Sequence, residues 1–236
     1  MGWPNNFVQG VYNSNNELIA VQDGAGGQIG LAATSTWADK PLASEYIGAM
    51  FILDIGGGTY WVSNGVRWKP LNGRCTIHSI DVPTTPVTID GTVRLVVTTP
   101  LLPAGVFQVG DVLEVDSVIV KGNGTAATMA PALYFSTSTT VVGTRSNLTF
   151  FQPTSGTAVL SSAVFRFRKK SASILEQATL RNGAVGNSST VASIDDNIVV
   201  DTDAPFAIQV ATNASVSLTE TLQAITFTVS IYSSIG

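Results

Sequence analysis

The sequence predicts an all-β protein in two parts: a small irregular N-terminal module with a β-hairpin, then an antiparallel β-sandwich of jelly-roll type. The first observation is strict alternation of apolar and polar residues late in the chain, clearest at residues 225–231. The second is the interruption of such runs by Gly, Pro, Asn and Ser/Thr clusters, with the spacing of a sandwich. The third is the lack of helical periodicity. We expect the N-terminal module at residues 1–75 and the sandwich at residues 76–236.

The N-terminal module is rich in Gly and Asn and has few strand-like segments. Glycine clusters at residues 23–27 and 56–58 predict chain reversals. Residues 18–21 and 49–54 have strand character, and residues 35–46 have room for one helical turn near Lys40-Pro41.

A hairpin closes this module at residues 60–70. Asn64-Gly65 predicts its turn, because a type I′ turn needs positive φ at both central residues and Asn-Gly tolerates it best. By sequence parity, Trp61 and Trp68 are expected on opposite sides. A hairpin this short is not stable alone in water, so its aromatic face is expected to pack against its own domain, another subunit or a larger assembly.

The later region reads as strand after strand. Jelly roll is the preferred topology, because an antiparallel set of this size must protect its edges and two Greek keys do so in roughly 150 residues. The expected strands are residues 76–82, 93–99, 111–121, 132–139, 147–152, 163–170, 174–180, 189–201, 206–213 and 222–233.

Two features resemble proteins of tailed-bacteriophage virions. Residues 60–70 are similar to the hairpin pattern (Y/W)W-x-(S/D)-(N/D)-G-x-x-W of fibre, spike and head-decoration proteins. The run from Gly110 to Thr144 is similar to fibre knobs, in which a long strand, an Asn/Gly-rich turn and a strand ending at a glycine pack as one hairpin. Here that turn is residues 121–125.

The resemblance implies a structural virion protein without enzymatic activity or cofactor. It implies a homotrimer whose residues 1–75 dock to other virion proteins and whose β-sandwich knob is displayed outward, where it can bind host surface glycan. Contacts to the virion or to another subunit are expected at Tyr60, Trp61 and Trp68. The resemblance does not decide between two alternatives: a tail-fibre or spike protein, and a capsid decoration protein that binds no receptor.

The composition of the chain excludes several classes of partner. The chain has 12 Lys and Arg against 16 Asp and Glu, a net charge of −4, and a pI near 4.8, so phosphate binding by a positive field is disfavoured and we expect no nucleic-acid partner. No apolar run approaches the roughly 18 to 20 residues that cross a bilayer, so no membrane partner is expected. The N-terminus lacks a secretory pattern, which predicts synthesis in a host cytoplasm before assembly into the virion. The single cysteine, Cys75, excludes an intrachain disulfide.

Catalytic patterns are weak. Cys75, His78 and Asp81 supply thiol, imidazole and carboxylate, but on a strand His78 faces away from the other two, so a structural role is favoured. Glycosidases use pairs of carboxylates, and the sequence offers Asp54 with Asp81, and Asp111 with either Glu114 or Asp116. We interpret these acids as solvated side chains. Gly56-Gly57-Gly58 lacks the Lys-Ser/Thr of a phosphate loop and is read as a turn.

Two charged clusters have alternative interpretations. The acidic side chains of Asp195, Asp196, Asp201 and Asp203 suit calcium, although their spacing fits no EF-hand, and they are otherwise polar loop ends. A basic cluster can meet an anionic receptor or keep an exposed strand from edge pairing, and the acidic cluster can neutralise it. The basic cluster consists of Arg166, Arg168, Lys169 and Lys170.

Two other function classes remain. A carbohydrate-binding module or lectin would use aromatic platforms such as Trp61, Trp68 and Tyr134 to stack on sugar faces. A hydrolase is the least favoured class, because the chain has one histidine and no recognisable nucleophile motif.

Overall fold

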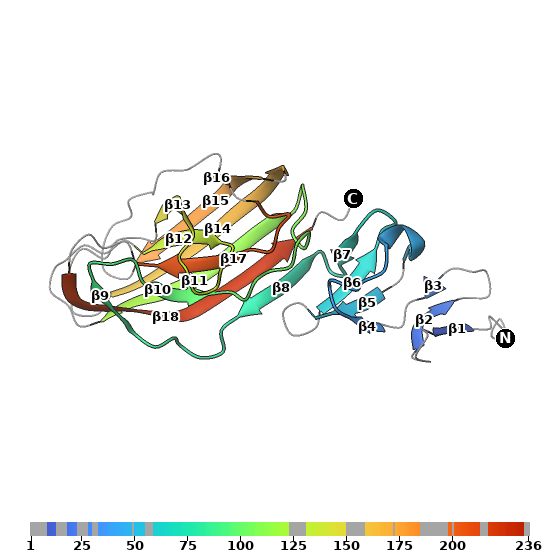
Figure 1. Cartoon of the computed structure of the whole chain (residues 1–236), viewed down its shortest axis with the longest axis horizontal. Coiled ribbons are helices and arrows are strands. Elements are labelled where there is room, and N and C mark those ends of the chain that lie inside the picture. Colours follow the sequence, from blue (N-terminus) through green and yellow to red (C-terminus); the bar gives the residue numbers. More distant parts are fainter. Residues whose placement is uncertain are drawn as a thin grey trace. The chain divides into compact units, whose positions relative to one another are not determined.

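The computed structural model describes residues 9–12, 18–22, 28–29, 33–48, 50–54, 59–122, 131–149, 159–171, 173–184, 198–199, 201–212 and 217–233. These residues form antiparallel sheets, one parallel strand pair and a single short 3-10 turn (Figure 1). Within them no helix has the length and apolar character needed to cross a bilayer.

The chain divides into two compact units. The first comprises Met1–Ile77 together with Tyr232–Gly236, and the second comprises His78–Ile231. The division therefore falls inside strand β8, Arg74–Ser79, two residues after the boundary expected from sequence. The end of the chain belongs to the first unit, where the Ser233 N–H donates to the Gly73 carbonyl at 2.9 Å.

Two antiparallel sheets build the second unit. One has the order β16-β15-β14-β11-β18-β8, with β9 also paired to β18, and the other has the order β10-β17-β12-β13. Besides β8, the strands are β9 Val87–Asp90, β10 Leu95–Thr98, β11 Val112–Gly122, β12 Ala132–Ser136, β13 Thr144–Thr149, β14 Val159–Ser171, β15 Ile174–Ala184, β16 Ile198–Val199, β17 Ala207–Ala211 and β18 Ser217–Tyr232.

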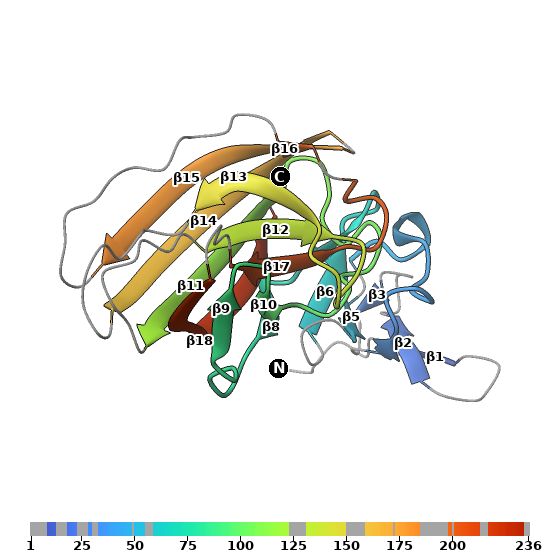
Figure 2. The same cartoon turned by 60° about the vertical axis from the view of Figure 1, so that its left-hand side comes forward.

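Eight of these strands form nested antiparallel couples: β9 with β18, β10 with β17, β11 with β14, and β12 with β13. The first and third couples lie in the larger sheet, and the second and fourth lie in the smaller one. A ribbon of four strand pairs rolled over on itself gives this arrangement, which is the double Greek key of a jelly roll. Figure 2 shows the smaller sheet stacked over the larger one. The all-β, jelly-roll-like fold class is confirmed.

The core of the second unit lies between the sheets. Phe135 on β12 meets Phe167 on β14 edge to face, with ring centroids 5.6 Å apart. Alternate residues line this interface, as the period of two requires, and each fully buried large apolar side chain contributes about 1.5 to 3 kcal/mol. They include Leu113, Val115, Phe165, Leu133, Ile208, Val210, Phe227 and Val229.

Three expectations for the sandwich need correction. Strand β9 was not expected, because Val87–Asp90 is a four-residue segment between Pro86 and Gly91. Of the strand expected at residues 189–201, only Ile198–Val199 is a strand within the described residues. Finally, β11 and β12 do not form one hairpin: they belong to different sheets, and β11 pairs with β14 over ten residues.

The first unit contains two small sheets. Strands β1 Gln9–Tyr12, β2 Leu18–Gln22 and β3 Gln28–Ile29 form an antiparallel sheet, so the expected strand at residues 18–21 is present. The second sheet has the order β4-β5-β6-β7, with bounds Ala33–Ser35, Met50–Leu53, Thr59–Ser63 and Trp68–Pro70, and its β4-β5 pair is parallel. The expected helical turn is the 3-10 helix η1, Ala43–Glu45.

The hairpin β6-β7 is present, but its turn and its faces differ from the expectation. The loop has four residues, Asn64 to Arg67, in which Gly65 takes a positive φ of 85°. Trp61 pairs directly with Pro70, and Ser63 with Trp68, so both tryptophans lie on one face. The expectation of opposite sides was wrong because parity is preserved along a strand, whereas directly opposed residues of this hairpin have unlike parity.

That face packs inside the first unit. The Trp61 ring lies edge-on to Trp37 at 5.0 Å between centroids, and Trp68 lies edge-on to Phe51 at 4.9 Å. Both indole N–H groups have acceptors: Trp61 donates to the Thr59 hydroxyl at 2.6 Å and Trp68 to a backbone carbonyl at 2.8 Å. Buried aromatic rings with satisfied N–H groups stabilise a small core.

Candidate functional site

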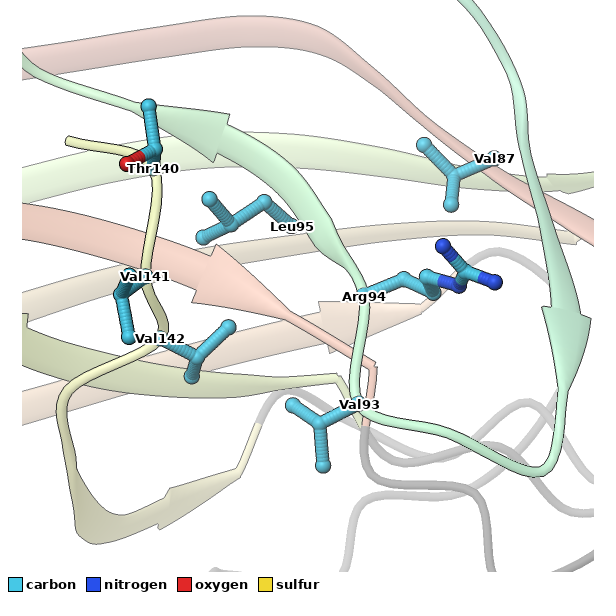
Figure 3. A pocket seen from close by; sticks show the side chains of 7 residues that line it. All are labelled: Val87, Val93, Arg94, Leu95, Thr140, Val141 and Val142. Carbon is cyan, nitrogen blue, oxygen red and sulfur yellow. The ribbon is translucent and has the colours of Figure 1, made fainter.

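A depression of about 650 Å³ lies on the second unit beside strands β9 and β10 (Figure 3). Val87 and Arg94 stand at one end of it, and Thr140 and Val141 at the other. We call it the valine depression, and its lining consists of Val87, Val93, Arg94, Leu95, Thr140, Val141 and Val142.

The β9-β10 turn forms one wall and is held by two polar residues. The Asp90 carboxylate accepts hydrogen bonds from the Thr92 N–H at 3.1 Å and from the Thr92 hydroxyl at 2.5 Å. The Thr212 hydroxyl, buried after β17, accepts from the Arg94 N–H at 2.8 Å and donates to the Thr92 carbonyl at 3.1 Å. The turn is therefore tied to the sheet at both ends.

Arg94 also forms an ion pair with Asp90. The hydrogen bond from Arg94, followed by those from Thr92, lowers the pKa of Asp90 well below its ordinary value, and the same pairing raises the pKa of Arg94. Both groups therefore stay ionised at neutral pH. Because both are exposed, the pair chiefly fixes the orientation of Arg94.

The β12-β13 loop, residues 137–143, forms the other wall and is anchored from below by Gln209. This buried β17 side chain donates to the carbonyls of Ser138 at 2.8 Å and Val141 at 3.1 Å, and accepts from the Gly143 N–H at 3.1 Å. A Cβ at Gly143 would lie 2.0 Å from the Phe135 carbonyl oxygen, so only glycine lets the loop approach the strand this closely.

The floor of this region is the outer face of the smaller sheet. Ala132, Tyr134 and Ala211 are buried there, and Leu95 and Val142 pack against them. The described lining residues are apolar apart from Arg94 and Thr140, and among them there is neither a nucleophile with a base nor a carboxylate pair. Its chemistry suits binding of an apolar surface.

The residues expected to contact the virion separate into two kinds. Trp61 and Trp68 are buried in the first unit and are unavailable as surface anchors without unfolding. Tyr60 points the other way on β6 and is 52% exposed. Of the three, Tyr60 alone is accessible to a partner.

Two arginines of the basic cluster lie beside acidic residues on neighbouring strands. Arg166 donates to Glu114 at 2.6 Å, and these two residues are cross-strand partners on β14 and β11. Arg168 is exposed and stands opposite Glu176 of β15 in the strand register. Lys170 is also exposed. This pattern favours the structural interpretation of the cluster over an anionic receptor contact.

Lys169 is the exception to the expected exposure of this cluster. It shares the inward face with Phe165 and Phe167 and is 1% exposed. Its ammonium group donates to the Phe107 carbonyl at 2.8 Å and forms an ion pair with Asp203, which is 57% exposed. Lys169 therefore ties two loops to β14 and is not available to a receptor.

The remaining candidate sites do not assemble into chemistry among the described residues. Asp195 and Asp196 lie outside them, while Asp201 accepts the backbone N–H groups of Asp203 and Ala204 and so shapes its own loop. No group of three His, Cys, Asp or Glu side chains gathers as metal ligands in the described part of the chain.

Cys75 and His78 on β8 are both shielded from water. Burial raises the pKa of the Cys75 thiol, and a hydrogen bond with Thr59 opposes this. Burial lowers the pKa of His78, with the Asp81 charge acting in the opposite direction. A neutral thiol and a neutral imidazole of low basicity do not make a reactive pair.

Sequence reasoning missed the residues that shape the valine depression. Asp90-Gly91-Thr92 carried a turn signal, but nothing in the sequence showed that Gln209 and Thr212 would hold loops 66 to 120 residues away. No family model, curated protein or solved structure matches this chain. Its function is therefore inferred from the residues and geometry above.

Proposed function

We propose that this chain is a non-enzymatic structural protein of a tailed-phage virion, a short homotrimeric fibre, spike or decoration protein. Residues 1–75 attach it to other virion proteins, and the jelly-roll unit is displayed outward. The support is the resemblance of the hairpin to virion proteins, together with a jelly-roll second unit, a fold found in viral capsid and lectin domains.

The observation that carries the proposal is the apolar surface around the valine depression. Val93 is 47% exposed and Val141 is 64% exposed, and both border a lining made mostly of Val and Leu. Clustered exposed apolar side chains are typical of surfaces that become buried in an assembly. With 12% charged residues and no intrachain disulfide, the chain is suited to gaining stability from subunit burial.

Within this class, a displayed jelly roll can bind host surface glycan or only decorate the capsid. A free-standing lectin that stacks sugars on Trp61, Trp68 or Tyr134 is not supported, because all three side chains are buried. Hydrolase activity has no support from the Cys75 and His78 environment described above.

Light scattering of the purified full chain tests the trimer. We expect about 74 kDa, three times the 24.6 kDa of one chain. Val93→Asp and Val141→Asp should lower this mass by placing carboxylates in the buried contact, whereas Val82→Asp, at an exposed valine outside the lining, should not. A wild-type mass of 24.6 kDa that is independent of concentration would remove the trimer, and unaltered mass in both depression variants would remove this contact.

A further inference from the structure

Asn-Gly pairs are chemically labile positions in a chain, because glycine has no Cβ to hinder the reaction of its nitrogen with the preceding side chain. The sequence has four such pairs, at residues 64–65, 72–73, 123–124 and 182–183. The structure describes three of them, since residues 123–124 lie outside the described ranges. These three pairs differ in how the asparagine is held.

The pair at residues 182–183 is held within a long strand. Asn182 and Gly183 lie on β15 and oppose Ala163 and Ser162 of β14 in the antiparallel register. A backbone paired in a ladder cannot turn the glycine nitrogen towards the asparagine side chain unless several of the ladder hydrogen bonds break. This pair is therefore protected by its strand.

The pairs at residues 64–65 and 72–73 are closely matched. Both asparagines are exposed, and both glycines take a positive φ, 85° at Gly65 and 68° at Gly73. Each glycine N–H donates one hydrogen bond, Gly65 to a side-chain hydroxyl at 3.1 Å and Gly73 to a backbone carbonyl at 2.9 Å. Exposure and the hydrogen bonding of the glycine nitrogen therefore do not distinguish these two sites.

The two asparagine side chains are held differently. The Asn64 carboxamide oxygen accepts from the Val66 N–H at 3.1 Å and from the Arg67 N–H at 2.9 Å, so this group is fixed against its own loop. The Asn72 carboxamide makes no hydrogen bond with any residue that the structure describes. Two hydrogen bonds must therefore break before the Asn64 side chain can react, whereas the Asn72 side chain is free to turn.

We propose that Asn72-Gly73 is a site of spontaneous succinimide formation, and that its isoaspartate product loosens the end of the chain from the β7-β8 turn. A base removes the proton of the Gly73 nitrogen, which then attacks Cγ of Asn72. The new N–Cγ bond closes a five-membered ring, and the bond from Cγ to Nδ2 breaks as Nδ2 takes up a proton and leaves as ammonia. Water then opens the ring at one of its two carbonyls, which gives aspartate or isoaspartate.

The hydrogen bonds of the turn explain the structural consequence. The Gly73 N–H donates to the Pro70 carbonyl, and the Gly73 carbonyl accepts from the Ser233 N–H, each at 2.9 Å. In isoaspartate the main chain passes through the side-chain carbons, which lengthens it by one methylene group just before Gly73. Both hydrogen bonds then lose their geometry. Ser233 belongs to the first unit with Gly73, so its attachment within that unit should weaken.

Ageing of the purified full chain at mildly alkaline pH, followed by peptide mass spectrometry, tests the site. Asn72 should change from amide to acid about tenfold faster than Asn64, because the two hydrogen bonds that hold Asn64 must first break. In urea, where neither side chain is held, the two asparagines should react at similar rates. The site needs neither a trimer nor a virion, so its failure would leave the proposed function untouched.

The matched variant is Asn72→Gln, which keeps a carboxamide but must close a larger and more slowly formed ring. This variant should show no conversion at residue 72 and an unchanged rate at Asn64. Hydrogen exchange at the Ser233 amide should become faster in aged wild-type protein and should stay unchanged in aged Asn72→Gln.

Either of two results would overturn the proposal. One is native conversion of Asn64 as fast as that of Asn72, or no native conversion of Asn72 over a period in which both react in urea. The other is unchanged hydrogen exchange at Ser233 in protein that mass spectrometry shows to carry isoaspartate at residue 72.

Discussion

Replacing Gln209 with Leu should destabilise the second unit and loosen one wall of the valine depression. Gln209 is fully buried on β17, and its amide makes three hydrogen bonds to the β12-β13 loop. Leu has a similar volume, so the substitution removes these bonds without opening a large cavity. Ser136, whose hydroxyl donates to the Val141 carbonyl at 2.9 Å, would still hold the loop at one point.

The magnitude follows from the number of bonds and from the exposure of the loop. Three hydrogen bonds at about 1 kcal/mol net each give roughly 3 kcal/mol. Thr140 and Val141 are exposed, so water can reach part of the loop and replace some of the lost partners. We therefore expect a loss of about 2 kcal/mol, which lowers Tm by roughly 4 to 8 °C for a unit of this size.

Urea denaturation and calorimetry of the full chain would measure this loss. Hydrogen exchange followed by mass spectrometry should show faster exchange in residues 137–143. Gln223→Leu is the matched control, because half-buried Gln223 donates one hydrogen bond, to the Thr84 carbonyl at 2.7 Å, and should cost about 1 kcal/mol or less. A loss below about 0.5 kcal/mol for Gln209→Leu, or one no larger than that of the control, would mean that these three hydrogen bonds do not stabilise the loop.

Three further predictions concern single residues. Gly143→Ala should cost more than about 3 kcal/mol by urea denaturation, because its Cβ would meet the Phe135 carbonyl, whereas Gly110→Ala, with no atom within 4 Å of its Cβ and a φ of 90°, should cost about 1 to 2 kcal/mol of backbone strain. Burial lowers the pKa of His78 in the folded chain, so as the pH drops the unfolded chain binds a proton at His78 before the folded chain does. The free energy of unfolding should therefore be highest above about pH 6.5 and should decrease as the pH drops from there towards the folded pKa. His78→Gln should remove this pH dependence of the free energy of unfolding between about pH 7 and 5. Cys75 is buried and its thiol pKa is raised, so a thiol reagent should label native protein at the rate of opening and label urea-unfolded protein at once; rapid native labelling would contradict the burial.

Local alternation predicted much of the sandwich, because one buried face imposes a period of two. Phe165 and Phe167 face the core and Arg166 faces outward, as the pattern required. The same period places Lys169 on the buried face, but its ion-pair partner Asp203 is 34 residues away, so the sequence did not reveal how that charge is satisfied. At Lys169 the strand period predicts burial and the charge predicts exposure; the side chain is buried, and its ammonium group meets the exposed carboxylate of Asp203.

Other features depend on contacts that no local pattern contains. The nested strand couples join segments that are as far apart in the sequence as β9 and β18. The number of strands therefore predicted a jelly roll, but the sequence did not predict the register in which the strands pair. The hairpin sequence predicted a turn at Asn64-Gly65, yet the four-residue loop decided which residues oppose Trp61 and Trp68. The valine depression exists because Gln209 and Thr212 hold two distant loops, which explains why sequence reasoning did not locate it.

A low-resolution reconstruction of the tailed-phage particle to which the proposed function assigns this chain tests that proposal most directly. We expect threefold features on the particle surface, each with volume for three copies of the chain, and an antibody against the jelly-roll unit bound at the outer end of each feature. If mass spectrometry does not find the chain in purified particles, the virion assignment is wrong. If the antibody binds at the end nearest the particle, the proposed orientation is wrong.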